Sequence, residues 1–327
     1  MGRLLTVNGL STEFRTERGI VKAVNNMSYY IDEGEIVGIV GESGCGKSVS
    51  QLSVMQLVPS PPGKVVSGTV EFGDEDLLKY SRKSKEMCSV RGREISMVFQ
   101  EPMTSLNPAM NISKQMSEVL RTHLKTGKAE AREKSIDMLS QVGIPDAGKR
   151  VDDYPHQFSG GMRQRVMVAM AMLCTPKLII ADEATTALDA TIQAQLLELL
   201  YSLVDKFNVA LVMVTHNLGI VARYANRINV MYAGQIVETG TVKEIWANPM
   251  HPYTQGLISC VPKIGEKLVP IEGMPPSLIN RPPTCAFLAR CRHRKKECFE
   301  EPVSELTYID DRHATACNVR LKEAGVF

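Results

Sequence analysis

The sequence predicts an α/β fold built around a phosphate-binding loop, and three observations support this prediction. Short apolar runs rich in β-branched residues alternate with longer helix-like stretches along the 327-residue chain. One of these runs leads directly into the glycine-rich motif GESGCGKS, residues 41–48. Other runs end at a polar or charged residue. In an open parallel sheet, ligands bind beyond the carboxyl ends of the strands, so these residues mark a candidate site.

Four apolar runs are expected to form the central strands: EIVGIVG (35–41), EISMVF (94–99), KLIIA (177–181) and VALVMVT (209–215). Their apolar residues occupy consecutive positions, which is typical of parallel strands covered by helices on both faces. LLTV, residues 4–7, reads as an opening strand. The first run continues into GESGCGKS, and the others are followed by Gln100, by Asp182 and Glu183, and by His216. The sequence therefore predicts that these polar groups meet at one edge of the sheet.

GESGCGKS fits the phosphate-binding pattern G-x-x-x-x-G-K-S/T, called the P-loop below. Its glycines allow the backbone N–H groups to converge on a phosphate, and the helix expected to begin near Lys47 adds its positive dipole end. Lys47 would reach the β- and γ-phosphates, and Ser48 would ligate Mg²⁺. The alternative is a glycine turn with a purely structural role. The residues expected to bind nucleotide here are Gly41, Ser43, Gly44, Cys45, Gly46, Lys47, Ser48 and Val49.

The run LIIADE delivers two adjacent carboxylates at the end of a buried strand. Such a pair is costly unless a cation or a reaction uses it. We expect Asp182 to hold the Mg²⁺ shell and Glu183 to polarise the attacking water. Gln100 and His216 would contact the metal, the water and the γ-phosphate. Taken singly, Gln100 also suits a surface amide and His216 a buried structural imidazole.

A second anion-binding motif lies at FSGGMRQR, residues 158–165, where Ser159, Gly160 and Gly161 open a helix-like run. A cap hydroxyl and bare backbone N–H groups at a helix N-terminus attract anions. The chain already has one phosphate cradle, so this motif would serve a second nucleotide or another purpose. An ordinary helix N-cap is the alternative.

Composition sets broad bounds on these predictions. The net charge of +2 indicates no nucleic-acid partner. The sequence has no apolar stretch near the ~18 residues of a membrane-spanning helix, and MGRLLTVNGLSTEF lacks the order of a signal peptide. We therefore expect a soluble, intracellular chain. In a reducing compartment its eight cysteines would be core residues or metal ligands rather than disulfides.

GESGCGKS, Gln100, FSGGMRQR, IIADEATTALD and VTHNL, in this order, resemble the nucleotide-binding subunits of ABC transporters. The resemblance implies a P-loop NTPase fold with a mixed core sheet and an inserted helical subdomain at about residues 101–165. A groove beside Gln100 would receive a short helix of the membrane partner. Two subunits would sandwich two ATP molecules head to tail, with Ser159, Gly160 and Gly161 acting on the nucleotide of the other subunit. Asp189 would lie at the subunit contact.

The same resemblance suggests that Phe14, in STEF, stacks on adenine; a core or loop phenylalanine is the alternative. Ala184 stands where the family usually has proline, and Asn217 where it usually has aspartate. Ala184 removes no functional group, so catalysis is expected to persist. Asn217 lacks a charge beside the switch histidine and would alter coupling modestly.

A closer resemblance, to dipeptide and oligopeptide importers, rests on VFQEPMTSLNPAM, YPHQFSGGMRQRVMVAMAM, HPYTQGL and the final cysteine region. KSVSQLSVMQLVP resembles the D-type subunit, which pairs with a different, F-type ATPase subunit. The implied partners are that subunit, two transmembrane permeases and an extracytoplasmic peptide-binding protein. The chain would lie peripherally on the cytoplasmic face of the inner membrane. The cargo stays open among dipeptides, longer peptides, nickel complexes and sugars.

The alternative function is a soluble ABC-type ATPase acting on nucleic acid or ribosomes. Such proteins usually fuse two cassettes, insert long coiled coils or carry zinc modules. This chain has one cassette, no heptad insertion and a near-neutral charge, all of which favour the importer. A metabolic P-loop kinase would not explain FSGGMRQR.

Residues 1–262 are expected to form the nucleotide-binding domain and residues 263–327 a C-terminal extension. The extension starts as a proline- and glycine-rich arm and continues to Cys285, Cys291, Cys298 and Cys317. A four-thiolate metal site would stabilise so short a segment, although unligated thiols are the alternative and the spacing does not choose the metal. The resemblance implies a 4Fe–4S cluster on these four cysteines, with His293 as a possible substitute ligand.

Basic residues surround these thiols: Arg290, Arg292, Arg294, Lys295 and Lys296. We expect them to lower the thiol pKa values and to offset the charge of a four-thiolate cluster. Nucleic-acid binding and a solvated charged face are the alternatives. Cys88, Cys174 and Cys260 have no partner pattern and are expected to be packing residues.

Overall fold

The computed structural model describes residues 2–100, 105–184, 189–262, 265, 267, 269–279, 283–303 and 305–326. The chain divides into two compact units. The helical unit contains Glu33–Glu35 and Tyr80–Val212, and the P-loop unit contains Gly2–Asp32, Ile36–Lys79 and Met213–Phe327. Strands and helices occur in both, which confirms the predicted α/β class. The predicted domain boundary at residue 262 stays a prediction.

The P-loop unit contains an antiparallel sheet with the strand order β2-β1-β4-β5. Its strands are β1 (Arg3–Thr16), β2 (Gly19–Asp32), β4 (Gly63–Phe72) and β5 (Glu75–Asp76), followed by the 3₁₀ helix η1 (Leu77–Lys79). Leu5 and Val7 on β1 are fully buried, as expected for alternate residues on the core face of a strand. Helix α1 (Lys47–Val54) is fixed to β1 by a buried hydrogen bond of 2.7 Å between the hydroxyls of Thr12 and Ser53.

A second sheet of this unit is mixed, as predicted. Strand β3 (Ile36–Val40) pairs in parallel with β9 (Arg227–Tyr232). Antiparallel pairing then continues from β9 to β10 (Gln235–Thr241), β12 (Ala314–Thr315) and β11 (Thr307–Tyr308). The remaining helices of the unit are α9 (Leu218–Tyr224), α10 (Val242–Ala247), α11 (Pro252–Ser259), α12 (Glu297–Glu300) and α13 (Asn318–Glu323).

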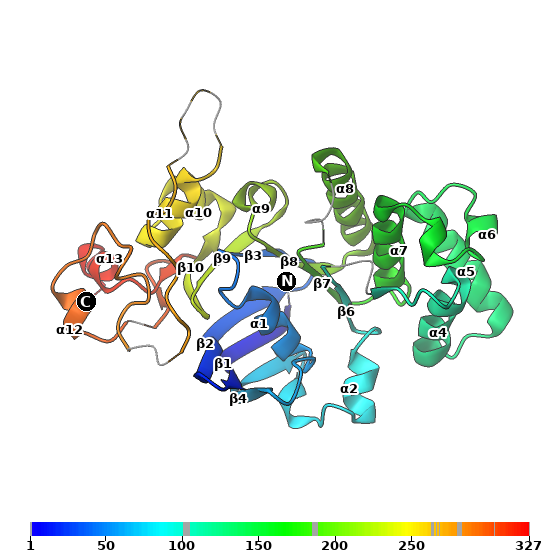
Figure 1. The fold of residues 1–327 in the computed structure, drawn as a ribbon, viewed down its shortest axis with the longest axis horizontal. Coiled ribbons are helices and arrows are strands. Elements are labelled where there is room, and N and C mark those ends of the chain that lie inside the picture. The colour runs from blue at the N-terminus through cyan, green and yellow to red at the C-terminus, as the bar shows by residue number, and fades with distance from the viewer. Residues whose placement is uncertain are drawn as a thin grey trace. The chain divides into compact units, whose positions relative to one another are not determined.

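The helical unit holds a parallel pair of strands, β6 (Ile95–Val98) and β7 (Leu178–Asp182). Strand β8 (Ala210–Thr215) begins in this unit and ends in the other. The four central strands lie within one residue of the ends predicted for them. Between β6 and β7 the chain forms helices that gather together, drawn in green in Figure 1. The helices and 3₁₀ helix of this unit are α2 (Lys85–Val90), α4 (Ile112–Leu124), α5 (Lys128–Gln141), α6 (Ala147–Arg150), η2 (Pro155–Gln157), α7 (Gly160–Met172) and α8 (Ala190–Phe207).

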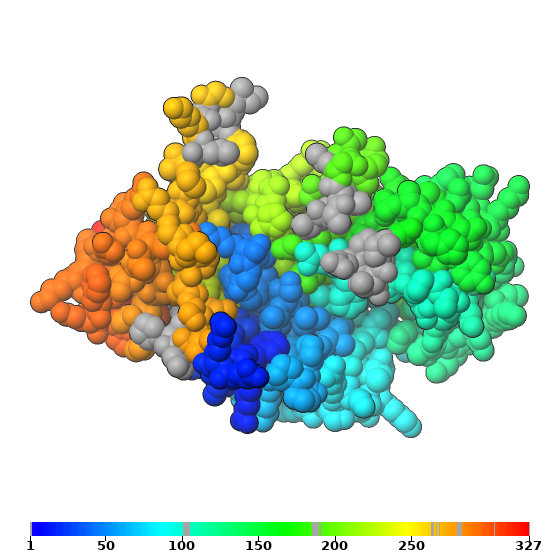
Figure 2. Space-filling view, viewed as in Figure 1, coloured from blue at the N-terminus to red at the C-terminus, as the bar shows by residue number. Residues whose placement is uncertain are grey.

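The described residues of the arm, 269–279, form no helix, and the end of this segment pairs with β2. The N–H of Lys22 donates to the carbonyl of Leu278 at 3.0 Å, and Ile279 forms an antiparallel bridge with Val21. Figure 2 shows this segment, in orange, reaching the blue N-terminal strands. The arm is therefore tied to the P-loop unit by backbone pairing.

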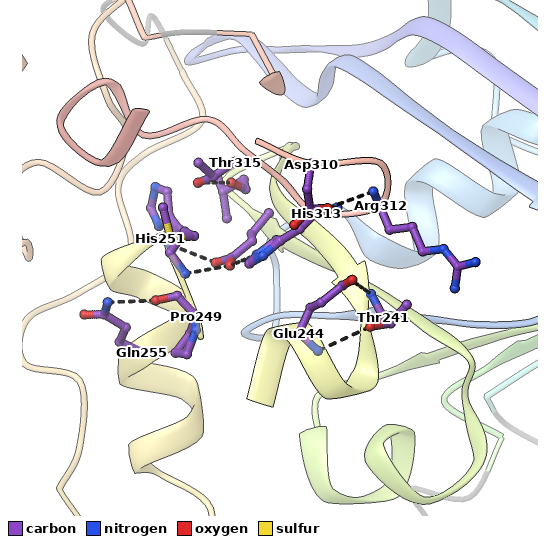
Figure 3. Close-up of polar contacts among 12 residues, drawn as sticks. Thr241, Glu244, Pro249, His251, Gln255, Asp310, Arg312, His313 and Thr315 are labelled. Atoms are coloured by element: carbon purple, nitrogen blue, oxygen red, sulfur yellow. Dashed lines mark hydrogen bonds and ion pairs between the residues drawn. The ribbon is translucent and has the colours of Figure 1, made fainter. Parts of the chain in front are cut away.

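A buried carboxylate fixes the C-terminal segment to β10 (Figure 3). Glu238 is fully buried and accepts hydrogen bonds from the N–H groups of Met250 and His251, at 2.7 and 2.8 Å. Its other contact is with Nε2 of His313, at 2.7 Å, immediately before β12. These contacts hold β10, the start of α11 and β12 together.

None of the helices in the described part of the chain has the length and apolarity needed to cross a bilayer.

Candidate functional site

The P-loop links β3 to α1, as predicted. Gly46 has a φ of +102° and lies against the carbonyl of Ala23, with which a Cβ atom would collide. A Cβ atom at Gly41 would likewise collide with the carbonyl of Met231. Both positions therefore require glycine, because any larger residue would push the loop off its support.

Lys47 is buried inside the loop, with 4% of its surface exposed. Its Nζ donates to the carbonyls of Gly41 and Glu42, at 2.9 and 3.1 Å. The ammonium group is thus held where the loop backbone curls around it. Burial raises the pKa of the neighbouring Cys45 thiol, and the charge of Lys47 partly opposes this shift. Cys45 is accordingly a packing group whose carbonyl accepts from the N–H of Gly234 at 2.8 Å.

Two residues outside the predicted nucleotide site also hold the loop. The hydroxyl of Tyr253, on α11, accepts a hydrogen bond of 2.9 Å from the N–H of Glu42. The guanidinium of Arg290, in the C-terminal extension, binds the Glu42 carboxylate. Tyr253 belongs to the motif HPYTQGL, which was visible in the sequence but carried no chemical argument.

In the helical unit, two of the predicted catalytic residues are in contact. Nε2 of Gln100, just after β6, donates to Oε2 of Glu183 at 3.0 Å, just after β7. The parallel pairing of β6 with β7 produces this contact, because it aligns the two carboxyl ends. Asp182, the last residue of β7, is buried with 6% exposed.

The two departures from the family pattern have structural partners. The carbonyl of Ala184 accepts a hydrogen bond from the buried side chain of Gln164. Asn217 caps α9, and its Oδ1 accepts from the N–H groups of Gly219 and Ile220 at 3.0 and 3.4 Å. An aspartate at this position would make the same cap with a negative charge, so Asn217 keeps the geometry and removes the charge.

His216 follows β8 and is exposed. It belongs to the P-loop unit together with Ser48, whereas Gln100, Asp182 and Glu183 belong to the helical unit. The meeting of these two groups at one edge therefore stays a prediction.

The second anion-binding motif is an exposed helix N-terminus. Ser159 is the N-cap of the 13-residue helix α7, and its Oγ accepts from the N–H of Met162 at 3.3 Å. Ser159 and Gly160 are exposed, and a Cβ atom at Gly160 would meet no atom within 4 Å. Ser159 therefore is an N-cap, as the alternative interpretation expected. Because it is exposed, an anion outside the chain can also reach it.

Asp189 is likewise an exposed N-cap, whose Oδ1 accepts from the N–H groups of Thr191 and Ile192 at 3.1 and 3.0 Å at the start of α8. The preceding residues of the TALD motif, 186–188, lie outside the described part of the chain. Phe14 is half-buried on β1, opposite Val21 and Gly63.

The four cysteines of the extension converge. Cys285, Cys291, Cys298 and Cys317 line one cavity, together with His293. The other three thiols each act electrostatically on Cys285 and raise its pKa, although burial raises it more. Among the described residues, no group of three or more His, Cys, Asp or Glu side chains is placed to hold a metal ion.

The predicted fall in thiol pKa is wrong for Cys285, Cys291 and Cys317, although the charge of Arg294 does lower the pKa of Cys291 in part. Burial raises the pKa of Cys285 to about 11 and also raises the pKa values of Cys291 and Cys317. Arg290 binds Glu42, and Arg292 and Lys295 bind Glu272 and Glu323. Desolvation therefore outweighs the remaining positive charge.

The prediction that the other cysteines are packing residues fails for Cys88, which is exposed. Cys174 and Cys260 are partly buried.

Comparison with known proteins gives consistent results. The family model described as "ABC transporter" matches residues 24–186, and "Oligopeptide/dipeptide transporter, C-terminal region" matches residues 237–298. The chain is 48% identical over 320 residues to the dipeptide transport ATP-binding protein DppD of Bacillus subtilis (strain 168), covering 97% of this chain and 95% of the relative. It is 47% identical over 326 residues to DppD of Escherichia coli (strain K12), covering 98% of each.

Two solved structures share the fold. The dimeric structure of MJ0796, a bacterial ABC transporter cassette, matches with a TM-score of 0.65 and 25% identity, covering 73% of this chain and 99% of that chain. CbiO1 of Clostridium perfringens, part of the transporter complex CbiONQ, matches with a TM-score of 0.63 and 24% identity, covering 76% of this chain and 92% of that chain.

Proposed function

We propose a function from the family: the chain belongs to the ATP-binding subunits of ABC transporters, in the dipeptide and oligopeptide transporter branch. In this proposal it energises peptide import through ATP-driven, head-to-tail pairing with a second ATPase subunit. The P-loop would hold the phosphates of ATP, and Phe14 would stack on the adenine. Ser48, Gln100 and Asp182 would hold magnesium, whose charge would offset that of the phosphates. Asp182 suits this role because a buried carboxylate at a strand end favours a cation.

Hydrolysis would use the residues that follow the strands. Glu183 would orient and deprotonate the attacking water, while Gln100 holds the Glu183 carboxylate through the 3.0 Å hydrogen bond. His216 would contact the γ-phosphate. Ala184 and Asn217 supply no proton-transfer group in this scheme.

The exposed N-terminus of α7 is the observation that carries the pairing proposal. Ser159 and Gly160 face solvent at the positive end of a 13-residue helix, in a chain that has a separate P-loop for its own nucleotide. Together with Gly161 they would bind the γ-phosphate held by the P-loop of the companion subunit. Asp189 would lie near this contact. ATP would thus join the two subunits, and hydrolysis would release them.

The remaining partners follow from the relatives. We propose an F-type ATPase as the companion, two permeases in the membrane and an extracytoplasmic binding protein that selects the peptide. The chain would be bound to the permeases at the cytoplasmic face of the inner membrane, without contact to nucleic acid.

We also propose that Cys285, Cys291, Cys298 and Cys317 hold a 4Fe–4S cluster. Such a cluster takes one thiolate at each of its irons, which suits four partly buried thiols around one cavity. When bound, it would crosslink the segments that carry these cysteines. The chain would bring the four thiols to one cavity, and the thiols would lose their protons on binding.

Ser159→Arg tests the pairing. In a background that slows hydrolysis, Glu183→Gln, the variant should still bind ATP as an isolated chain. It should no longer form an ATP-dependent complex with the companion subunit, because the arginine side chain would block the exposed N-terminus of α7. Light scattering with and without ATP measures the complex, and a fluorescent ATP analogue measures binding.

Ser202→Arg is the matched control, since Ser202 is an exposed serine on α8. This control should pair normally. Loss of ATP binding in the isolated Ser159→Arg chain, or pairing equal to the control, would contradict a role for Ser159 on the other subunit's nucleotide.

A further inference from the structure

An ion pair joins the C-terminal extension to the P-loop. Nη1 and Nη2 of Arg290 donate to Oε2 and Oε1 of Glu42, at 2.7 and 2.8 Å. This is the paired, planar geometry in which arginine binds carboxylate most strongly. The Arg290 side chain is 4% exposed and the Glu42 side chain 26%. The pair is therefore largely shielded from the solvent and salt that weaken surface ion pairs.

The guanidinium of Arg290 uses all five of its N–H donors. Besides the two bonds to Glu42, Nε donates to the carbonyl of Glu272 at 3.0 Å. Nη1 also donates to the hydroxyl of Tyr232, and Nη2 to the carbonyl of Ile271, both at 3.3 Å. Lysine could not reproduce this fork, because its ammonium is a point charge with three donors. Only arginine has the donors needed to make all five of these hydrogen bonds.

Aromatic side chains enclose the pair. Rings of Tyr232 and Phe287 lie 5.9 and 5.8 Å from the guanidinium carbon. Tyr253 packs on Tyr232, with ring centroids 4.5 Å apart, and its hydroxyl accepts the N–H of Glu42. Both the backbone and the side chain of Glu42 are thus held by residues from the C-terminal half of the chain.

We propose that Arg290 is a positioning residue for the P-loop: it neutralises the Glu42 carboxylate and fixes its direction, so that the extension sets the affinity of the loop for ATP. The proposal rests on the P-loop being the phosphate site. The P-loop would bind polyphosphate through backbone N–H groups and Lys47. A negative side chain within the loop lowers this affinity, because it repels the negatively charged phosphates. Glu42 is such a side chain, and Arg290 removes its net charge.

The test compares three full-length variants by titration with a fluorescent ATP analogue. Arg290→Met leaves the partly exposed Glu42 unpaired, and the dissociation constant should rise by about tenfold or more. Arg290→Met with Glu42→Gln removes both charges and should return it to within about threefold of the unmodified protein. Arg292→Met is the matched control: Arg292 lies in the same segment but pairs with Glu272 at the surface, 66% exposed, and should bind ATP normally.

The double variant separates charge from structure. If Arg290 acts only by holding the extension together, adding Glu42→Gln cannot restore binding, and equal losses in the single and double variants would overturn the proposal. So would Arg290→Met binding ATP as tightly as Arg292→Met. If Arg290→Met does not fold, Arg290→Gln takes its place, because glutamine is uncharged but can still donate hydrogen bonds. This variant should weaken ATP binding, and adding Glu42→Gln should restore it. Failure of Glu42→Gln to restore binding would overturn the proposal.

Lys47→Ala distinguishes failure of this proposal from failure of the phosphate site itself. Lys47→Ala should lose most ATP affinity. If it does so while Arg290→Met binds normally, the positioning role alone fails. If Lys47→Ala binds ATP normally, the assignment of the P-loop fails, and with it the basis of the inference.

Discussion

Glu183 adopts a φ of +44°, in the left-handed region that residues other than glycine rarely occupy. Such a backbone costs about 1–3 kcal/mol and persists where the surroundings enforce it. Here the carbonyl of the next residue, Ala184, is held by Gln164, and the side chain of Glu183 is held by Gln100. Strain of this kind concentrates at functional sites, which supports the catalytic role proposed for Glu183.

Glu183→Gln should slow ATP turnover by at least about a hundredfold, because the amide cannot accept a proton from water. ATP affinity should stay close to that of the unmodified protein, since the change keeps the size of the side chain. Single-turnover hydrolysis and analogue binding measure the two quantities. Hydrolysis at the unmodified rate would show that another residue is the base.

At the scale of elements, short helices in the P-loop unit depend on their caps. Helix α11 begins after His251, whose Nδ1 accepts from the N–H of Tyr253 at 3.1 Å. This bond requires an unprotonated Nδ1. Burial lowers the pKa of His251 to about 4, and the charge of Glu238 partly opposes the shift. Nε2 of His313 contacts the same Glu238 carboxylate, at 2.7 Å.

The cap predicts a dependence of stability on pH. The pKa of histidine in the unfolded chain is ~6.5, so between pH ~6.5 and about 4 the unfolded chain binds a proton that the folded chain does not. Stability should therefore fall as the pH drops through this window, by at most ~3 kcal/mol, and His251 should contribute no change above it. Denaturant unfolding at several pH values measures this.

His251→Asn supplies the control for that measurement. Asparagine can accept the same hydrogen bond but does not titrate. The variant should lose stability less steeply on acidification, while carboxylates contribute equally to both proteins. Identical slopes would show that His251 does not cause the loss.

At the scale of the whole chain, residues far apart in sequence meet within the P-loop unit. Arg290 reaches Glu42, and His313 reaches Glu238. Phe287, 4% exposed, lies between two cysteines of the extension and packs on Tyr232 and Tyr253 in the core. The extension is thus anchored in the same core that supports the P-loop. Disruption at the cysteines should therefore also disturb the packing beside the P-loop.

Protein purified without oxygen should be brown, with iron and sulfide each near about four per chain, if the four cysteines hold the proposed cluster. Cys285→Ser should lose the visible absorption and make the extension easier to cleave by protease. Cys88→Ser is the control, because Cys88 is exposed and outside the cavity. Colourless protein with one zinc per chain would contradict the cluster.

Much of the fold was predictable because the signals were local. Each central strand was an uninterrupted apolar run, and the structure places all four within one residue of their expected ends. The P-loop pattern depends on residue types within eight positions, so its turn and the start of α1 followed directly. The contact between Gln100 and Glu183 needed one further step, the pairing of parallel strands.

The contacts that hold the P-loop in place were not predictable, because they join segments that no local pattern relates. Arg290 was interpreted as a counter-charge for thiols, yet it lies against Glu42, which is 248 residues away in sequence. The thiol pKa values were predicted to fall, yet burial raises those of Cys285, Cys291 and Cys317, and burial depends on how the whole unit packs.

By itself, the sequence determined the strands, the phosphate loop and the order of the motifs, because short-range periodicity and spacing encode these features. The tertiary structure alone decided which distant side chains support the loop and which groups lose contact with water. The physical reason is that charge pairing and desolvation depend on distances through space, and chain position does not specify those distances.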